Sequence, residues 1–238
     1  MNTKTAIFLL HGALNDFSQP ANYGKPIKVN FKGRQSAKHL IESLHIPHTE
    51  VGAIRNDHQA VDLSYIVQDG DYLEFFPYPP GSRLSKDGIA FLLDNHLGKL
   101  ATYLRILGFD AAYQNDLPDQ ALAEIAAKSG KILLTRDRGL LMRKVVSEGY
   151  YVRSLDPKEQ LLEILTRYQL FDDIRPFKRC LKCNSELEPV EKEAVIDRLE
   201  PLTRRYYHDF HVCPECGQLY WKGSHYEHMQ EFINSITD

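Results

Sequence analysis

The sequence has little that would place it in a membrane or outside a cell. Its apolar runs are far shorter than a bilayer-spanning helix requires. The apolar stretch at residues 6–10 lacks the core and cleavage site of a signal peptide, so we expect a cytoplasmic protein with no membrane partner. No glycine-rich phosphate loop occurs, so nucleotide hydrolysis is not expected. The formal net charge is only −3 in 238 residues, and a role in nucleic-acid binding must therefore rest on a local basic patch.

The pattern of residues 1–80 predicts a small mixed sheet crossed by one helix. Helical spacing begins after Ser36, which is a suitable N-cap, and an Asp-Gly turn precedes the last apolar alternation. We interpret the segment as ββαββ, a β-grasp domain. The stretches that carry this interpretation are residues 8–14, 26–31, 36–44, 53–56, 61–67 and 69–77.

This order resembles the ubiquitin-like β-grasp fold, and residues 69–77 resemble the ending of small sulfur-carrier proteins of that class. Those carriers end in a free Gly-Gly. Here the chain continues from Pro77 through Pro79 and Pro80, so a carrier role is not expected. We interpret residues 1–80 as an interaction or packing module that offers a surface to a protein partner.

Residues 77–85 are rich in proline and predict a linker, because consecutive prolines do not join a helix or a central strand. Strands and helices then alternate four times, which predicts an α/β domain with a parallel sheet and helices on both faces, at residues 86–175. The predicted elements are 89–93, 95–107, 109–113, 119–129, 131–135, 139–148, 150–155 and 157–168.

Four acidic residues lie where a parallel sheet would gather them. Asp94, Asp137 and Asp156 follow strands, and Asp119 opens a helix. Ligands of open parallel sheets bind beyond the carboxyl ends of the strands, and Mg²⁺ and Mn²⁺ prefer oxygen ligands. The pattern therefore predicts a catalytic Mg or Mn site. The alternatives are N-caps for Asp119 and Asp156 and an ion pair for Asp137.

Basic residues crowd around the same acids and are candidates for binding phosphate. Arginine can bind it bidentately, and lysine binds as a point charge. The alternative is a solvated helix face. The candidate phosphate-binding residues are Lys99, Arg136 and Arg138, and Arg105, Arg143 and Lys144 lie near them in the sequence.

The four cysteines form two C-x-x-C pairs in the segment 176–238, and there are no others. In a chain without a secretion signal this pattern indicates zinc rather than disulfides. Four thiolates complete a tetrahedron, so Cys180, Cys183, Cys213 and Cys216 predict a closed structural zinc site in a zinc ribbon. Alternative ligands are His208, His211, His225 and His228.

Aromatic side chains are concentrated around the second cysteine pair. They could stack on unpaired bases, or they could form the small core of the ribbon. The sequence leaves both readings open. The residues concerned are Tyr206, Tyr207, Phe210, Tyr220 and Trp221.

Three stretches together carry a family resemblance: FLLDNHLGKLATYLRILGFDAAY, LPDQALAEIAAKSGKILLTRDRGLL and CPECGQLYWKGSH. They resemble the RNase domain first known from the C-terminal part of the Mut-seven exonucleases, a PIN-like nuclease with an appended zinc ribbon that in some members follows a ubiquitin-like domain. The resemblance implies Mg²⁺- or Mn²⁺-dependent cleavage of RNA. It implies that Asp94, Asp119 and Asp137 are the first three acids, with Asp156 as the positional candidate for the fourth.

Two other functions remain open. The first is a non-catalytic RNA- or ribosome-associated adaptor that binds through the ribbon and the β-grasp domain. The second is a phosphotransfer enzyme, which also places an aspartate after its first strand. Dehalogenase-like members of that class usually have Asp-x-Asp, whereas here Asn95 and His96 follow Asp94.

Overall fold

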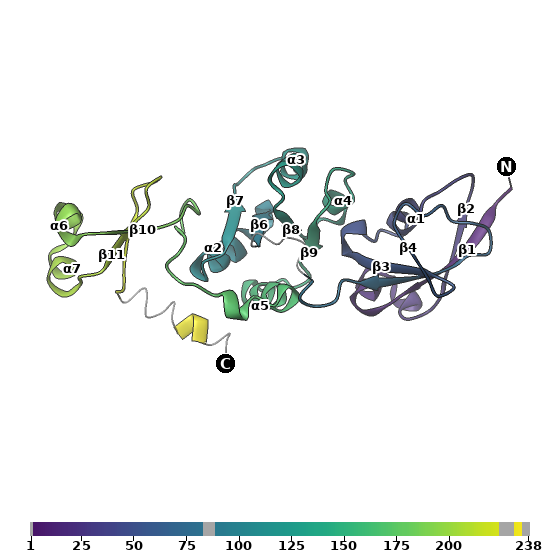
Figure 1. The fold of residues 1–238 in the computed structure, drawn as a ribbon, viewed down its shortest axis with the longest axis horizontal. Helices are drawn as coiled ribbons and strands as arrows, with labels where there is room; N and C mark the ends of the chain where they lie inside the picture. Colours follow the sequence, from purple (N-terminus) through teal and green to yellow (C-terminus); the bar gives the residue numbers. More distant parts are fainter. Residues whose placement is uncertain (1, 83–88, 224–230, 235–238) are drawn as a thin grey trace.

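The computed structural model of the chain describes residues 2–82, 89–223 and 231–234. Its three sheets follow one another along the long axis in chain order, and the central sheet lies between the other two (Figure 1). None of the described helices is both long and apolar enough to cross a bilayer.

The N-terminal part is a ubiquitin-like β-grasp domain whose sheet has the order β2-β1-β5-β3-β4. The central pair β1 and β5 is parallel, and the other pairs are antiparallel. Ser36 caps the helix as predicted, since its side chain accepts the N–H of His39. The elements are β1 (Lys4–Leu10), β2 (Ile27–Phe31), α1 (Ala37–Ser43), β3 (Val51–Asn56), β4 (Gln59–Val61) and β5 (Tyr72–Pro77), with short helices η1 (Gly12–Phe17), η2 (Pro20–Asn22) and η3 (His48–Glu50).

The predicted hairpin strand at residues 8–14 is wrong in its extent, because β1 ends at Leu10 and the short helix η1 follows from Gly12. The stretch at residues 61–67 is part of a strand only at its first residue. β4 ends at Val61, because the next residue starts a turn: the Asp62 carboxylate accepts both the N–H and the hydroxyl of Ser64. With β4 pairing to β3 as a separate strand, the order is ββαβββ rather than ββαββ.

The central sheet is wholly parallel, as predicted, with the order β7-β6-β8-β9. Helices α2 and α5 pack on one face with Phe91 and Leu93, and α3 and α4 pack on the other with Leu92 and Leu133 (Figure 1). The elements are β6 (Ala90–Leu93), α2 (Gly98–Ile106), β7 (Asp110–Tyr113), α3 (Asp119–Ser129), β8 (Ile132–Thr135), α4 (Arg138–Leu141), β9 (Gly149–Tyr151) and α5 (Pro157–Tyr168).

Three predicted elements of this domain are shorter than expected. α2 begins at Gly98 rather than at residue 95, because residues 95–97 form a separate short helix. α4 ends at Leu141, and the chain then turns so that the Val146 carbonyl meets His48 Nε2 of the N-terminal domain at 2.9 Å. β9 ends at Tyr151, because Nη1 of Arg136 lies within 2.5–3.0 Å of the next three carbonyl oxygens, those of residues 152–154. The end of β9 thus coincides with a contact from another strand end, whereas α4 gives way to local turns in which the Arg143 N–H bonds to the Leu140 carbonyl and the Val146 N–H to the Arg143 carbonyl.

The C-terminal part is a small antiparallel sheet of β10 (Glu188–Val190), β11 (Phe210–Val212) and β12 (Leu219–Trp221). Between β10 and β11 the chain forms α6 (Lys192–Val195) and α7 (Pro201–Tyr206). The C-terminal segment returns to the central domain, where Phe232 and Ile233 join its core.

Side chains from the two flanking parts cover both edges of the central sheet. At the β9 edge, the Tyr151 N–H donates to Glu50 Oε1 at 2.6 Å. At the β7 edge, the Ala111 N–H donates to Asn184 Oδ1 at 2.9 Å. Unpaired strand edges are sites of aggregation, so these contacts protect the sheet as well as join its neighbours.

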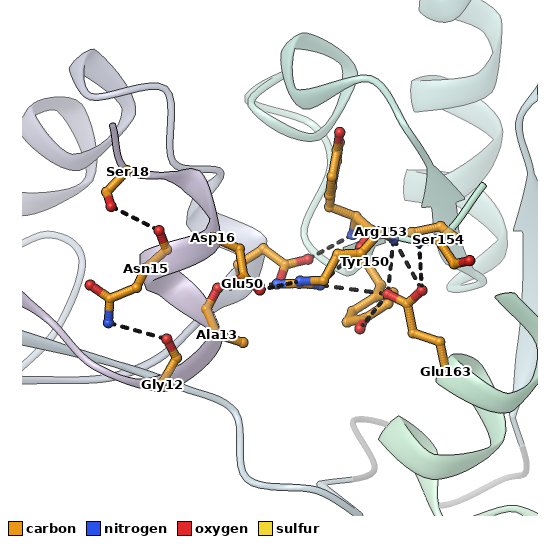
Figure 2. Close-up of polar contacts among 12 residues, drawn as sticks. Gly12, Ala13, Asn15, Asp16, Ser18, Glu50, Tyr150, Arg153, Ser154 and Glu163 are labelled. Carbon is orange, nitrogen blue, oxygen red and sulfur yellow. Dashed lines mark hydrogen bonds and ion pairs between the residues drawn. The ribbon is translucent and has the colours of Figure 1, made fainter. Parts of the chain in front are cut away.

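Arg153 is the centre of the contact between the first two domains (Figure 2). Its guanidinium bonds to Asp16 at 2.9 Å and to Glu50 at 3.0 Å, both from the N-terminal domain. Burial raises the pKa of Glu50, and Arg153 opposes that rise. Burial alone would lower the pKa of Arg153, but the Glu50 carboxylate reverses this and the net shift is upward. The two domains are therefore joined by a buried ion pair.

Candidate active site

Asp94 directly follows β6 and is 5 % exposed. Its Oδ1 accepts the N–H of Asn95, and its Oδ2 accepts the Thr135 hydroxyl at 2.6 Å. Among the described Lys, Arg and His residues, none forms an ion pair with it. Buried carboxylates are stable when they are paired or bind a metal. The surroundings of Asp94 therefore fit a cation ligand.

Thr135, at the end of β8, joins the two strand ends that carry Asp94 and Asp137. Its hydroxyl donates to Asp94 and accepts the Asp137 N–H at 2.9 Å. A hydroxyl has one proton, so it can make this pair of bonds in only one orientation. Thr135 was not among the predicted residues, although its position at the end of an apolar strand, two residues before an acid, is a usable signal.

Asp137 is the N-cap of α4, and its Oδ1 accepts the Gly139 N–H at 2.6 Å. No ion pair joins Asp137 to the arginines on either side of it in the described structure. Its carboxylate thus lies at an exposed helix start next to the buried Asp94–Thr135 pair.

Asp119 is the first residue of α3, and Pro118, not Asp119, is the N-cap. Its side chain is half exposed, and its nearest cation is Arg143 at 4.0 Å. At this separation and exposure the pair adds little stability. The Asp119 carboxylate is therefore not held by a strong contact within the described structure.

Asn95 connects the Asp94 strand end to the loop that leads to Asp119. Its Nδ2 donates to the Leu117 carbonyl at 3.3 Å, and its own carbonyl accepts the Tyr113 hydroxyl at 3.0 Å. Its Oδ1 is buried and has no hydrogen-bond partner among the described residues. A buried acceptor without a donor is destabilising by about 1–3 kcal/mol, so an amide oxygen at this place also fits a cation or its water. The sequence alone did not indicate this residue.

Asp156 is the N-cap of α5, and its Oδ1 accepts the N–H groups of Lys158 and Glu159. This is the capping alternative that the sequence left open. Within the described residues, the acids do not form a ready-made cage: the four cysteines are the only group of three or more His, Cys, Asp or Glu ligands that converges.

The three candidate phosphate-binding residues differ in their surroundings. Arg136 bonds to the carbonyls that follow β9. The Arg138 guanidinium lies over the rings of Phe17 and Tyr151, at 4.9 and 5.5 Å from their centroids. Lys99 is exposed at the start of α2, where its ammonium lies 5.9 Å from the Tyr103 ring. Lys99 is therefore the least constrained of the three.

The four cysteine thiols converge as predicted, with all ligand atoms within 4.8 Å of one another. Sγ of Cys180 lies 3.6 Å from that of Cys216, and Sγ of Cys183 lies 3.3 Å from that of Cys213. Zinc–sulfur bonds of about 2.3 Å place tetrahedral sulfurs about 3.8 Å apart. The cluster is therefore compatible with a zinc ribbon in which every coordination position is filled by sulfur.

The first cysteine turn is bound to the central domain through the polar contacts of Arg105 and Asn184. Arg105, buried in α2, donates to the carbonyls of Ala111 and Leu181. Asn184 donates to Asp110, which also pairs with Lys131 at 2.6 Å. Burial would raise the pKa of Asp110, but these two hydrogen bonds outweigh it and lower the pKa.

The aromatic residues of the ribbon divide between its core and its surface. Phe210 is buried, and Tyr207 and Trp221 pack against it in the ribbon core. The Tyr220 hydroxyl bonds to the Leu181 N–H and to Cys180 Sγ, so it supports the first cysteine turn. Tyr206 is 63 % exposed. The predicted alternative ligands His208 and His211 are not in the metal-ligand group, and His225 and His228 lie outside the described residues.

A parallel α/β domain with acids at its strand ends, set between a β-grasp domain and a four-cysteine ribbon, defines a class of multidomain protein. Family models identify it: the Mut7-C RNAse domain matches residues 89–233, and the Mut7-C ubiquitin domain matches residues 3–82. The chain belongs to the Mut7-C RNAse domain family. A search of the curated proteins finds no match.

Proposed function

We propose that the chain is a metal-dependent ribonuclease that acts in the cytoplasm, with domain boundaries near residues 80–86 and 175. The observation that carries this proposal is the Asp94–Thr135–Asp137 connection at the carboxyl ends of two adjacent parallel strands. Together with the family of the chain, it supports an acidic site for a hard cation beside an RNA phosphate.

Asp94, Asp119 and Asp137 would hold Mg²⁺ or Mn²⁺, with Asn95 Oδ1 nearby and Asp156 as a further candidate. Such an ion would supply Lewis-acid stabilisation at the scissile phosphate. Thr135 orients the Asp94 carboxylate, and Lys99 and Arg138 would bind phosphate oxygens. Arg136 holds the backbone after β9. We propose that this support is its role at the site and that it makes no direct contact with the phosphate.

The adaptor function remains the second candidate for a specific reason. Two of the acids, Asp137 and Asp156, already cap α-helices, and the described carboxylates do not converge as the cysteines do. An adaptor would bind RNA without cutting it, and its acids would serve the fold alone.

Cleavage of end-labelled single-stranded RNA in Mn²⁺ tests the proposal. The wild type should cleave, and Asp94→Asn and Asp137→Asn should each lose roughly 100-fold or more, the scale on which one preorganised charged group acts. Asparagine can still accept the hydrogen bonds from Thr135 and Gly139, so both variants should fold. Asp62→Asn is the control, because Asp62 makes the same kind of local cap in the N-terminal domain.

Undiminished cleavage by both variants would refute this assignment of the active site. RNA binding without cleavage by the wild type, in either Mg²⁺ or Mn²⁺, would support the adaptor instead.

A further inference from the structure

A cleft of about 560 Å³ opens where the N-terminal domain meets the segment that follows Asp137. The η1–η2 segment and the turn after α1 form its N-terminal side, and Arg138 forms its other side. Ligand pockets of this size hold small molecules of nucleotide dimensions. All of the lining residues except Arg138 belong to the N-terminal domain, and Arg138 adds the contribution of the central domain.

Arg138 connects the cleft to the candidate active site. It is the residue directly after Asp137, and its Nη1 donates to the Phe17 carbonyl at 3.4 Å. Its guanidinium is held over the rings of Phe17 and Tyr151. A chain of RNA with one phosphate at the acids could therefore place its neighbouring nucleotide at this cleft.

The lining combines apolar surface with unused hydrogen-bonding groups. Ile27 and Leu44 are apolar, whereas Gln19, Asn22 and His45 are polar. Among the described residues, the side chains of these three make no hydrogen bond or ion pair with another residue. An apolar surface with a few free amide and imidazole groups suits an unpaired base, which presents a flat ring and polar edges.

His45 occupies a backbone position that favours glycine. It follows α1 with φ of 60°, and the Ile46 N–H bonds to the Ile41 carbonyl, which is the Schellman arrangement at a helix C-terminus. Glycine adopts this left-handed conformation with the least strain. Glycine at position 45 would therefore make the fold at least as stable as histidine does, so the imidazole is not needed for stability.

We propose that this cleft binds one unpaired ribonucleotide of the substrate, next to the phosphate held at the acids. Arg138 contacts the phosphate on that side, and Gln19, Asn22 and His45 bond to the edges of the base. The inference rests on the proposed ribonuclease function. It gives the ubiquitin-like domain a part in binding substrate.

The test is the affinity of the full chain for a fluorescein-labelled decamer of uridine, measured by anisotropy in an Asp94→Asn background. His45→Gly and Asn22→Ala should each raise Kd by roughly two- to tenfold, the effect of one lost hydrogen bond. His45→Gly should not lower the melting temperature, because glycine relieves the backbone strain. His45→Gly should therefore weaken RNA binding without lowering the melting temperature. A variant that bound weakly because it failed to fold would lower both.

His58→Gly is the matched control. His58 also has a positive φ, 72°, and it is exposed in the β3–β4 turn, outside the cleft. It should leave Kd unchanged. If His45→Gly and Asn22→Ala bind RNA as tightly as their Asp94→Asn parent, the cleft proposal is refuted while cleavage by the wild type would still support the ribonuclease. If the parent and the wild type bind no RNA, both proposals fail.

Discussion

Replacing Arg153 with methionine should destabilise the junction of the first two domains by leaving a buried carboxylate without its cation. Methionine keeps most of the apolar stem of arginine, so the change acts mainly on charge. Arg153 pairs with Glu50, whose side chain is 5 % exposed, with Asp16, whose side chain is 44 % exposed, and more distantly, at 3.8 Å, with Glu163. The Glu50 and Asp16 pairs, which join the two domains, differ in their expected contributions.

The Asp16 pair is half in solvent and should contribute about 0.5 kcal/mol or less. Glu50 is different, because without Arg153 its only remaining bond in the described structure is from the Tyr151 N–H. Breaking a buried pair by removing one partner is destabilising by about 3–5 kcal/mol. We expect a loss of about 3 kcal/mol for Arg153→Met, since the Arg153 side chain is itself 23 % exposed.

The double variant Glu50→Gln/Arg153→Met separates charge from packing. Glutamine can still accept the Tyr151 N–H and carries no charge, so the double variant should be more stable than Arg153→Met alone. Urea unfolding should be followed by far-UV circular dichroism, because the single tryptophan, Trp221, lies in the ribbon. Hydrogen exchange of peptides containing Tyr151 locates the effect.

The pH dependence has a definite sign. Burial already raises the pKa of Glu50 in the folded state, and loss of Arg153 should raise it further. A carboxyl group whose pKa is higher in the folded than in the unfolded protein contributes stability at pH values below its unfolded pKa. That contribution is lost as the pH rises through its folded pKa. The difference in the free energy of unfolding between Arg153→Met and wild type should therefore shrink as the pH falls towards about 4.5. A variant within 0.5 kcal/mol of wild type, or a double variant as unstable as the sum of the singles, would refute the reasoning.

Two further outcomes are expected. Metal analysis of the purified chain should find one zinc per chain. Chelation should release the ribbon and speed hydrogen exchange around Arg105, because Arg105 donates to the Leu181 carbonyl in the first cysteine turn. Unchanged exchange after complete zinc removal would contradict this. Asp110→Asn should lower the free energy of unfolding by about 1–2 kcal/mol at neutral pH, measured by thermal or urea unfolding. Because the pKa of Asp110 is lowered in the folded protein, this difference from wild type should vanish as the pH falls below the ordinary pKa range of aspartate. A difference that persists at such a pH would contradict the reasoning.

Helices α3 and α5, which have local start and stop signals, were predicted from the sequence to within a residue. Helix α3 ends before Gly130, which adopts φ of 65°, and α5 begins with Asp156 as N-cap and Pro157 as its first residue. These signals act through neighbouring backbone groups, so they can be recognised without the fold. By contrast, β9 ends where Arg136 bonds to the carbonyls that follow it, and no local pattern reports that contact. The segment after α4 meets His48 at Val146, which the sequence did not indicate either.

The same distinction applies to the candidate site. That Asp94 and Asp137 follow neighbouring parallel strands could be predicted from alternation and topology. The position of Thr135 two residues before Asp137 is a usable signal, but its hydrogen bond to Asp94 could not be predicted, because that bond depends on the register of β6 with β8, in which Leu93 lies opposite Leu134. Nor could the sequence show that the Arg138 guanidinium lies over the Phe17 ring, since that requires the placement of a second domain.

The arrangement of the three parts follows from the size of the central sheet. Four short parallel strands leave two edges, and each edge here has a backbone N–H that bonds to a side chain of a neighbouring part, Glu50 on one side and Asn184 on the other. Removing the N-terminal part would expose the Tyr151 N–H, leave Arg153 without Glu50 and Asp16, and free Arg138 from Phe17. All three changes fall on the strand and helix next to Asp137. An isolated central domain should therefore be less ordered around Asp137. The β-grasp domain thus forms part of the framework that holds the candidate site.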